Sequence, residues 1–369
     1  MARSAIDVIS PAFEHTKQQL LKPFSFGQWA RIALLAMATG EMSSGGGCNS
    51  FHIPTSFPTK FPPHQAQENF LQSPNLPDFL KGIDPALIGT LLMVAFVGGI
   101  VLVLVWIYVS SISRFVLYDT VVRRHCDMSP AWDRWHPQGM RFFWWQLALM
   151  VFSLGLSAVM LLPLIIPLIA IIKSQGKPDA TFFLGFIPFL ALFFVFSMFM
   201  LLVAVLTKDF VVPIMAVDGV GVIEGWRRLM AMMKADAPNY AGYIGMKIVL
   251  VIGAGILFSI IAGIVVVMLM IPAAIVGVIA VLMVKSAGIG WNAGTITAAL
   301  VAGILSFTAL LYVVAFVCVP VAIFFPAYAL YFLADRFPGL YTQLYGAPVA
   351  PAPGWTGPPT LPSAPVPIG

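Results

Sequence analysis

Charge is scarce in this sequence. Only 9% of the 369 residues are Asp, Glu, Lys or Arg, and 60% are hydrophobic, whereas soluble chains carry about 25% charged residues. A soluble surface of this size needs more charge than that, so the composition excludes an ordinary soluble protein and predicts a membrane protein. The basic residues stand beside apolar runs and form no concentrated patch, so we expect no nucleic-acid partner.

Metal and redox motifs are also missing. The three cysteines have no zinc or redox-pair spacing, and we expect plain thiols at Cys48, Cys126 and Cys318. No two histidines have metal spacing, and we expect surface side chains at His15, His52, His64, His125 and His136. The sequence therefore predicts no metal, no cofactor and no catalytic residue, and it leans against an enzyme.

Two further absences exclude a secretory signal and several transporter classes. The first apolar run starts only at Ile32, after a stretch that contains Asp7 and Lys17, which is unlike a signal peptide. The strong apolar runs have no ionisable residue near their centres, and Lys208 and Lys247 lie at their edges. Intramembrane charge marks proton pumps, ion-coupled transporters and voltage sensors, so these classes are disfavoured.

Long apolar runs are abundant. A spanning helix needs about 20 mostly apolar residues. Five segments meet this requirement: 86–110, 142–172, 181–207, 244–270 and 296–319. A sixth segment, 26–40, is shorter and contains Arg31, which can snorkel to the interface if the segment spans; a re-entrant helix is the alternative. We predict an all-α polytopic transmembrane bundle of about six spans over residues 26–335.

Lys and Arg are distributed unevenly between the two predicted sides. With six spans, fifteen of the 20 Lys and Arg residues fall on the side of both termini, and five fall on the other side. The positive-inside rule then places both termini in the cytoplasm, and we expect a multi-pass protein of the bacterial inner (cytoplasmic) membrane. Without the 26–40 span, the N-terminal charges would lie outside, so the bias also supports that span.

Two segments are rich in proline. Residues 41–84 are long and polar with prolines at six positions, which predicts an irregular outer loop. Its phenylalanines pack on helix ends or contact a partner. Residues 336–369 are predicted to be a disordered tail, because the part from Ala347 onward consists of proline, glycine, alanine and other residues that bury little apolar surface.

Amphipathic stretches predict helices that lie in the headgroup plane on the cytoplasmic side. In 220–234, Trp226 shares one helical face with isoleucine and methionine, and the basic residues occupy the opposite face. We expect the same placement for a helix through Trp132 and Trp135, and for the N-terminal segment 1–25.

Charged residues gather in the two cytoplasmic loops. We take seven as a candidate site for anionic lipid headgroups or a phosphate-bearing substrate: Asp119, Arg123, Arg124, Asp209, Glu224, Arg227 and Arg228. Ordinary positive-inside charge is the alternative explanation.

Prolines interrupt several predicted spans, for example Pro163, Pro188 and Pro272. Broken helices build substrate sites in some transporters, whereas kinks repaired by neighbouring helices are the commoner cause. The sequence therefore favours a non-enzymatic scaffold or accessory protein whose partners are membrane lipids and possible further membrane proteins. A transporter or channel for a neutral or lipid-like substrate is the alternative.

One stretch resembles a known family. Asp209-Phe210-Val211-Val212-Pro213-Ile214-Met215, followed by Glu224-Gly225-Trp226, is similar to the membrane domain of bacterial glycerophosphodiester phosphodiesterases and of its stand-alone relatives. The resemblance implies a bundle of roughly six helices in a membrane. It implies no activity, because that family's catalytic site opens with a His-Arg pair, and this sequence contains only the reverse order, Arg124-His125.

Overall fold

A computed structural model describes residues 3–22, 24–41, 85–174, 180–286, 288 and 293–345. These residues form helices and short connections, with no strand among them. The helices are α1 (Ile9–Leu21), α2 (Phe26–Thr39), α5 (Pro85–Arg123), α6 (Met128–Ser174), α7 (Ala180–Leu206), the π-helix η1 (Thr207–Val211), α8 (Val212–Asp218), α9 (Val222–Ala235), α10 (Ala237–Ser286), α11 (Ala293–Val317), α12 (Val319–Ala334) and α13 (Pro338–Tyr345).

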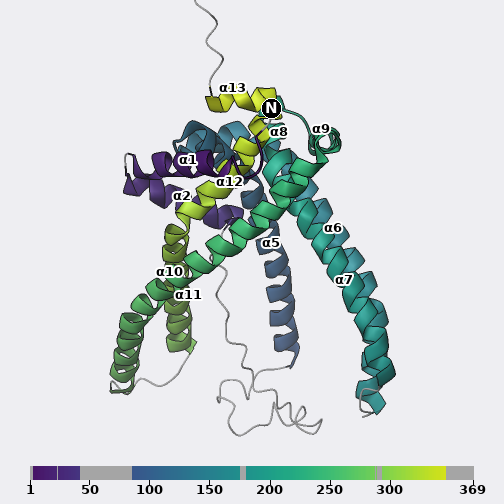
Figure 1. The fold of residues 1–369 in the computed structure, drawn as a ribbon. Coiled ribbons are helices and arrows are strands. Elements are labelled where there is room, and N and C mark those ends of the chain that lie inside the picture. The colour runs from purple at the N-terminus through teal and green to yellow at the C-terminus, as the bar shows by residue number, and fades with distance from the viewer. Residues whose placement is uncertain are drawn as a thin grey trace, which may run out of the picture.

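The helices divide into a packed head and three splayed legs (Figure 1). The head contains α1, α2, η1, α8, α9, α12 and α13, together with the adjoining ends of α5, α6 and α10. One leg is α5 alone, the second is the α6–α7 hairpin, and the third is the α10–α11 hairpin (Figure 1). This arrangement confirms the predicted all-α membrane bundle.

Five of the described helices are long and apolar enough to cross a membrane. They overlap the five strong predicted spans and lie at Met93–Arg123, Met128–Leu162, Ile187–Asp218, Ala237–Ser286 and Thr297–Val317. The segment predicted as the sixth span is α2, whose 14 residues cover about 21 Å at 1.5 Å per residue, less than the ~30 Å hydrocarbon core. It is not among the five, and its crossing stays a prediction.

Two predicted boundaries differ from the structure. The helix through Trp132 and Trp135 is not a separate interfacial helix, because α6 runs without a break from Met128. Its first turns are held against α5, where Trp135 stacks on Phe115 with ring centroids 5.9 Å apart. The tail also begins later than predicted, since α13 is helical and Leu340 within it is fully buried.

α12 forms the centre of the head. Thirteen of its 16 residues are buried, as expected for a helix that is apolar all round. Phe332 packs on Tyr243 with ring centroids 4.7 Å apart, and on Tyr240 at 5.4 Å. Each fully buried aromatic side chain contributes about 1.5–3 kcal/mol, so this aromatic core fixes the helix ends that enter the head.

Glycine allows a close contact between α5 and α6. A Cβ added at Gly139 of α6 would lie 2.6 Å from Ile112 Cγ1 and 3.0 Å from Ile112 Cα of α5. Because one of these atoms is backbone, a side chain at residue 139 would force the two helices apart. The α5–α6 crossing within the head therefore depends on glycine at this position.

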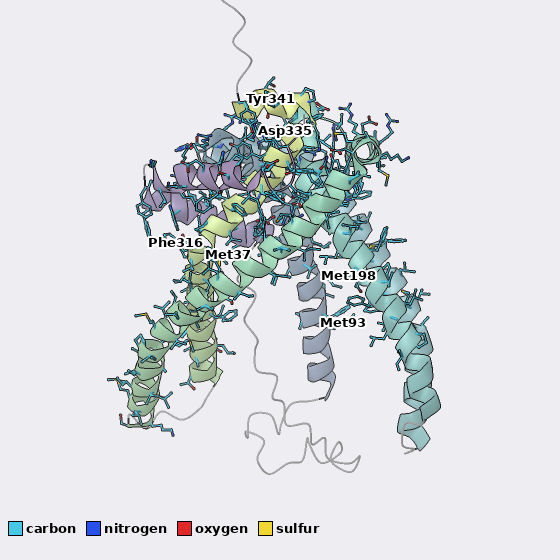
Figure 2. The ribbon with its side chains drawn as sticks, viewed as in Figure 1. Met37, Met93, Met198, Phe316, Asp335 and Tyr341 are labelled. Carbon is cyan, nitrogen blue, oxygen red and sulfur yellow. The ribbon has the colours of Figure 1, made fainter. Side chains whose placement is uncertain are left out.

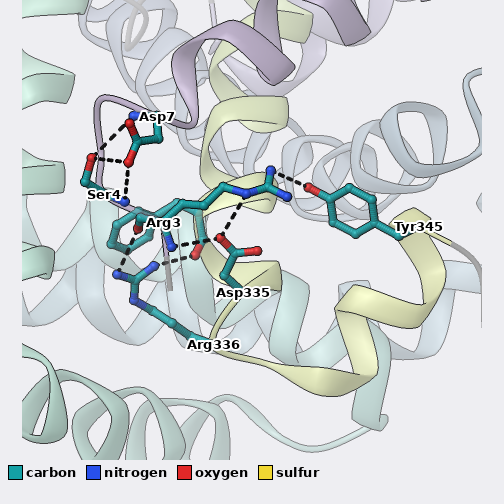
Figure 3. Close-up of polar contacts among 7 residues, drawn as sticks. Arg3, Ser4, Asp7, Asp335, Arg336 and Tyr345 are labelled. Atoms are coloured by element: carbon teal, nitrogen blue, oxygen red, sulfur yellow. Dashed lines mark hydrogen bonds and ion pairs between the residues drawn. The ribbon is translucent and has the colours of Figure 1, made fainter. Parts of the chain in front are cut away.

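Hydrogen bonds join Arg3, near the N-terminus, to residues at and beyond the end of α12 (Figure 3). The Arg3 backbone N–H donates to Asp335 Oδ2 at 3.1 Å, and the Arg3 side chain donates to the Tyr345 hydroxyl at 3.0 Å. Arg336 donates to the Arg3 carbonyl at 3.3 Å. The N-terminal segment predicted as a separate interfacial element is therefore part of the head, although Phe13 and Phe24 on its outer side are exposed.

Candidate functional site

A π-helical turn joins the α7 leg to the head. In η1 the Val212 N–H donates to the Thr207 carbonyl, five residues earlier. Pro213 follows, and it has no N–H with which to bond the Asp209 carbonyl four residues before it. The proline thus explains why the helix widens at this point, and such turns are frequent at functional sites.

Two ion pairs are buried at this turn. Lys208 Nζ lies 2.5 Å from Glu41 Oε2, at the end of α2. Asp209 pairs with Lys247 of α10 and accepts a hydrogen bond from the Tyr243 hydroxyl at 3.0 Å. Glu41 and Asp209 are each 4% exposed, and Lys247 is 7% exposed. Charges removed from water in this way are tolerated only when they are paired.

A fifth charge, Arg114 of α5, has no such partner. Its guanidinium lies 5.8 Å from the Phe142 ring centroid and within electrostatic range of the Glu41 and Asp209 carboxylates. No ion pair within 4.0 Å joins it to the described residues, and its Nε is buried without a hydrogen-bond partner among them. We call Glu41, Arg114, Lys208, Asp209 and Lys247 the junction cluster.

The junction cluster borders a small cavity of about 40 Å³, which we call the junction cavity. Glu41, Arg114, Lys208 and Asp209 lie on its wall, and the remaining lining residues are Leu117, Tyr118, Val212, Pro213, Pro326, Ala329 and Leu330. The volume holds about three water molecules, at 10–15 Å³ each on the same measure. The site therefore combines charged groups at one part of its wall with apolar surface elsewhere.

Aromatic packing holds one side of the junction cluster rigid. The Tyr243 ring stacks on Tyr328 of α12, with centroids 5.1 Å apart and planes 11° from parallel. Phe210 of η1 also packs on Tyr243, with centroids 4.9 Å apart. The hydroxyl that binds Asp209 is thus fixed by the same core that fixes α12.

The structure places the predicted candidate residues in separate locations. Asp119 pairs with Arg123 at 2.8 Å and with Arg134 at 3.2 Å. Arg124 donates to the Gln18 side chain at 3.0 Å. These side chains lie between α1, α5 and α6 and do not line the junction cavity.

The second predicted group lies on α9. Glu224 pairs with Arg227 and Arg228, and Arg228 also pairs with Asp218. Hydrogen bonding to Arg228 holds the pKa of Glu224 below its ordinary value. Of the seven predicted residues only Asp209 lines the junction cavity, so the structure does not bring them together in one pocket. Their role in binding anionic lipid stays a prediction.

The seven predicted site residues leave out four members of the junction cluster: Glu41, Arg114, Lys208 and Lys247. Each of these residues stands at the edge of an apolar run, and that position is the signal that the sequence offers. Glu41 and Lys208 are separated by 167 residues in sequence, so their contact depends on the tertiary fold.

The histidine prediction is wrong at His15, which is 2% exposed. Its Nε2 donates to the Val121 carbonyl at 3.0 Å, and its Nδ1 accepts from the Tyr331 hydroxyl at 3.1 Å. Burial, followed by the nearby Arg124 charge, lowers the pKa of His15 to about 4. His15 is therefore a neutral structural group of the head. His52 and His64 lie outside the described residues.

The thiol prediction is wrong at Cys318, which is disulfide-bonded. Cys126 is a buried free thiol, and burial raises its pKa. Cys48 lies outside the described residues. Within the part of the chain that the structure describes, no group of three His, Cys, Asp or Glu side chains is placed to hold a metal ion.

A family model described as "Family of unknown function (DUF7544)" matches residues 3–342. The match includes the head, all members of the junction cluster and the five candidate spans. No curated protein and no solved structure matches the chain.

Proposed function

Because the chain belongs to the DUF7544 family, whose function is unknown, we propose a function from its own geometry. The protein is a non-enzymatic membrane scaffold. Its rigid head holds the ends of the spans at one membrane surface, and the spans contact lipids and other membrane proteins. The proposal extends to placement in the bacterial inner membrane with both termini in the cytoplasm, which the Lys and Arg bias supports.

One observation carries the scaffold proposal: the head is packed, whereas the legs are almost entirely exposed. Between 0% and 11% of the residues in the most apolar stretch of each candidate span are buried. Figure 2 shows leg side chains directed outward, with Met93 and Met198 on separate legs, and these are 70% and 45% exposed. So much apolar surface requires lipid or a protein partner around each leg.

A photo-crosslinking experiment tests this proposal. A photoreactive residue at Phe194 of α7 or Val301 of α11, which are 62% and 51% exposed, should form adducts with lipids or membrane proteins in intact membranes. The matched control is the same residue at Phe332, which is fully buried in the head and should form only intramolecular adducts. Equal external labelling at all three positions would contradict the proposed division between head and legs.

A reconstitution experiment tests the absence of activity. Liposomes that contain the purified protein should show the same solute leakage, lipid flip-flop and phospholipid turnover as empty liposomes. Any flux or turnover that requires folded protein would overturn the scaffold proposal.

A second candidate function is transport of a lipid-like substrate. The observation that favours it is an apolar cavity of about 590 Å³ between α10 and α11, lined on opposite sides by residues such as Ala273 and Phe307. If lipid flip-flop is accelerated, replacing Ala273 with Phe should obstruct part of this cavity and reduce the acceleration. The resemblance to phosphodiesterase membrane domains fits either candidate, and we retain it as a proposal about the fold.

A further inference from the structure

Arg114 is the member of the junction cluster that has no ion pair among the described residues. Lys208 is paired with Glu41, and Lys247 is paired with Asp209. The Arg114 Nε is buried and has no hydrogen-bond partner among the described residues. A charge held away from water without a counter-charge is strongly unfavourable, so Arg114 favours an anionic ligand.

The hydrogen-bond donors of Arg114 point to the same requirement. A guanidinium has five N–H donors arranged in a planar fork that matches phosphate and carboxylate oxygens. Among the described residues, Arg114 makes no hydrogen bond, and its buried Nε has no acceptor. The Arg114 guanidinium lies over the face of the Phe142 ring, an interaction that uses none of its N–H donors and leaves them available to an oxyanion in the adjoining cavity.

The junction cavity has the size and the wall chemistry for one phosphate group. Its 40 Å³ corresponds to about three waters, which is the scale of a single oxyanion. Carbon atoms of Leu117, Ala329 and Leu330 form much of the rest of the wall. Such a wall can pack against the carbon groups that are esterified to the phosphate of a phosphodiester. A phosphodiester carries a single negative charge.

We propose that the junction cavity binds a phosphate group, with Arg114 as its main hydrogen-bond donor and Lys208 beside it on the cavity wall. A phospholipid headgroup and free inorganic phosphate share this chemistry. The cavity lies where the candidate spans enter the head, which is the level at which lipid phosphates are concentrated. The inference rests on the proposed membrane placement and names the lipid group that the scaffold would hold.

The binding experiment uses the purified full-length chain in a neutral detergent at constant ionic strength. It is titrated separately with sodium phosphate, with dihexanoylphosphatidylglycerol and with the glycoside detergent octyl glucoside as an uncharged amphiphile. The thermal unfolding midpoint is followed by tryptophan fluorescence, because a ligand that binds only the folded state raises it in proportion to its concentration and affinity. We expect phosphatidylglycerol to raise the midpoint with saturation, and the uncharged amphiphile to leave it unchanged.

Three variants locate the binding site. R114M removes the donor and leaves two balanced ion pairs, and A329V narrows the cavity without changing any charge. Both should weaken binding roughly 10- to 100-fold, which is the range for lost hydrogen bonds to charged groups. R141M is the matched control, because Arg141 is an exposed arginine of α6 whose side chain contacts only the Gly219 carbonyl at 3.3 Å among the described residues. It should bind within about twofold of the wild type.

The outcomes separate the lipid source from the free ion. Saturable stabilisation by phosphatidylglycerol alone supports a lipid phosphate, and equal stabilisation by inorganic phosphate supports a free-ion site. Stabilisation by neither probe overturns the proposal, as does equal weakening by R141M and R114M. If R114M fails to fold, normal binding by A329V overturns the proposal and weak binding supports it. The scaffold proposal fails independently, through flux or turnover.

Discussion

Lys247 of α10 pairs with Asp209 of η1, 38 residues earlier in the chain. Asp209 also accepts the Tyr243 hydroxyl hydrogen bond from the same helix. This pair ties the α10 leg to the α7 leg at the base of the head. Both members are nearly inaccessible to solvent, so substitutions at this pair test whether it holds the two legs together.

Replacing Lys247 with Met should destabilise the protein by about 3–5 kcal/mol, because the buried Asp209 carboxylate loses its ion pair. The double variant with Asp209→Asn should recover most of that loss, since the uncompensated charge is gone. Denaturant unfolding of the wild type, the two single variants and the double variant measures the coupling free energy between Lys247 and Asp209. Additive effects of the two substitutions would show that the pair is not formed.

Replacing Gly139 with Ala should destabilise the head by about 1–3 kcal/mol, which is the cost of overpacking a close contact. The new Cβ would collide with Ile112, including its backbone. Gly155 lies on the same helix, and a Cβ added there would meet no atom within 4 Å, so Gly155→Ala should be neutral or stabilise by about 0.5–1 kcal/mol. Unfolding midpoints of both variants decide whether α5 and α6 cross at Gly139.

Acidification should weaken the head through His15. Its folded-state pKa is about 4, below the ordinary value of 6.5, so the unfolded chain binds the proton more readily. The contribution of neutral His15 to the free energy of unfolding is fully present above pH 6.5 and is lost as the pH falls toward 4. Between pH 7 and pH 5 the loss is about 2 kcal/mol.

The control for the pH prediction is His15→Gln, which has no titrating ring at this position. Its unfolding free energy should depend less steeply on pH than that of the wild type over the same window. Parallel curves would mean that the acid sensitivity arises from other groups.

Replacing Asp335 with Asn should loosen the N-terminus without unfolding the protein. Asp335 accepts from the Arg3 N–H and lies 3.7 Å from its Nε, and a partly exposed pair of this kind contributes about 1 kcal/mol or less. We expect faster amide hydrogen exchange in residues 3–8 and an almost unchanged unfolding midpoint. Lys17→Gln, which breaks the exposed Glu14–Lys17 pair, should leave that exchange unchanged.

The spans could be predicted because hydropathy is a local property. Each of the five strong predicted segments overlaps a long apolar helix. The continuity of α6 could not be predicted in this way, because Pro137 is a local signal for a break. Packing of Trp135 on Phe115 and of Gly139 on Ile112 overrides that signal, and both contacts join residues of different helices.

The candidate site was less predictable than the fold. The sequence singles out Asp209 because it lies among the charged residues of a predicted cytoplasmic loop, but its partners Lys247 and Tyr243 both come from α10. The sequence shows that Lys208 and Lys247 lie at the edges of apolar runs, but it gives no means of pairing them. Basic clusters such as Arg227 and Arg228 are visible in a sequence, whereas the surroundings of a lone arginine such as Arg114 depend on the tertiary fold.

The burial of α12 has a consequence for biogenesis. Tyr328 of α12 donates to the Ala5 carbonyl at 3.1 Å across 323 residues of sequence, and α1 packs along the same helix. Because α1 precedes α12 in the sequence, α1 lacks its main packing surface until α12 has been synthesised. Completion of the head must therefore follow synthesis of α12, so a chain truncated before α12 would expose an unfinished core to proteolysis.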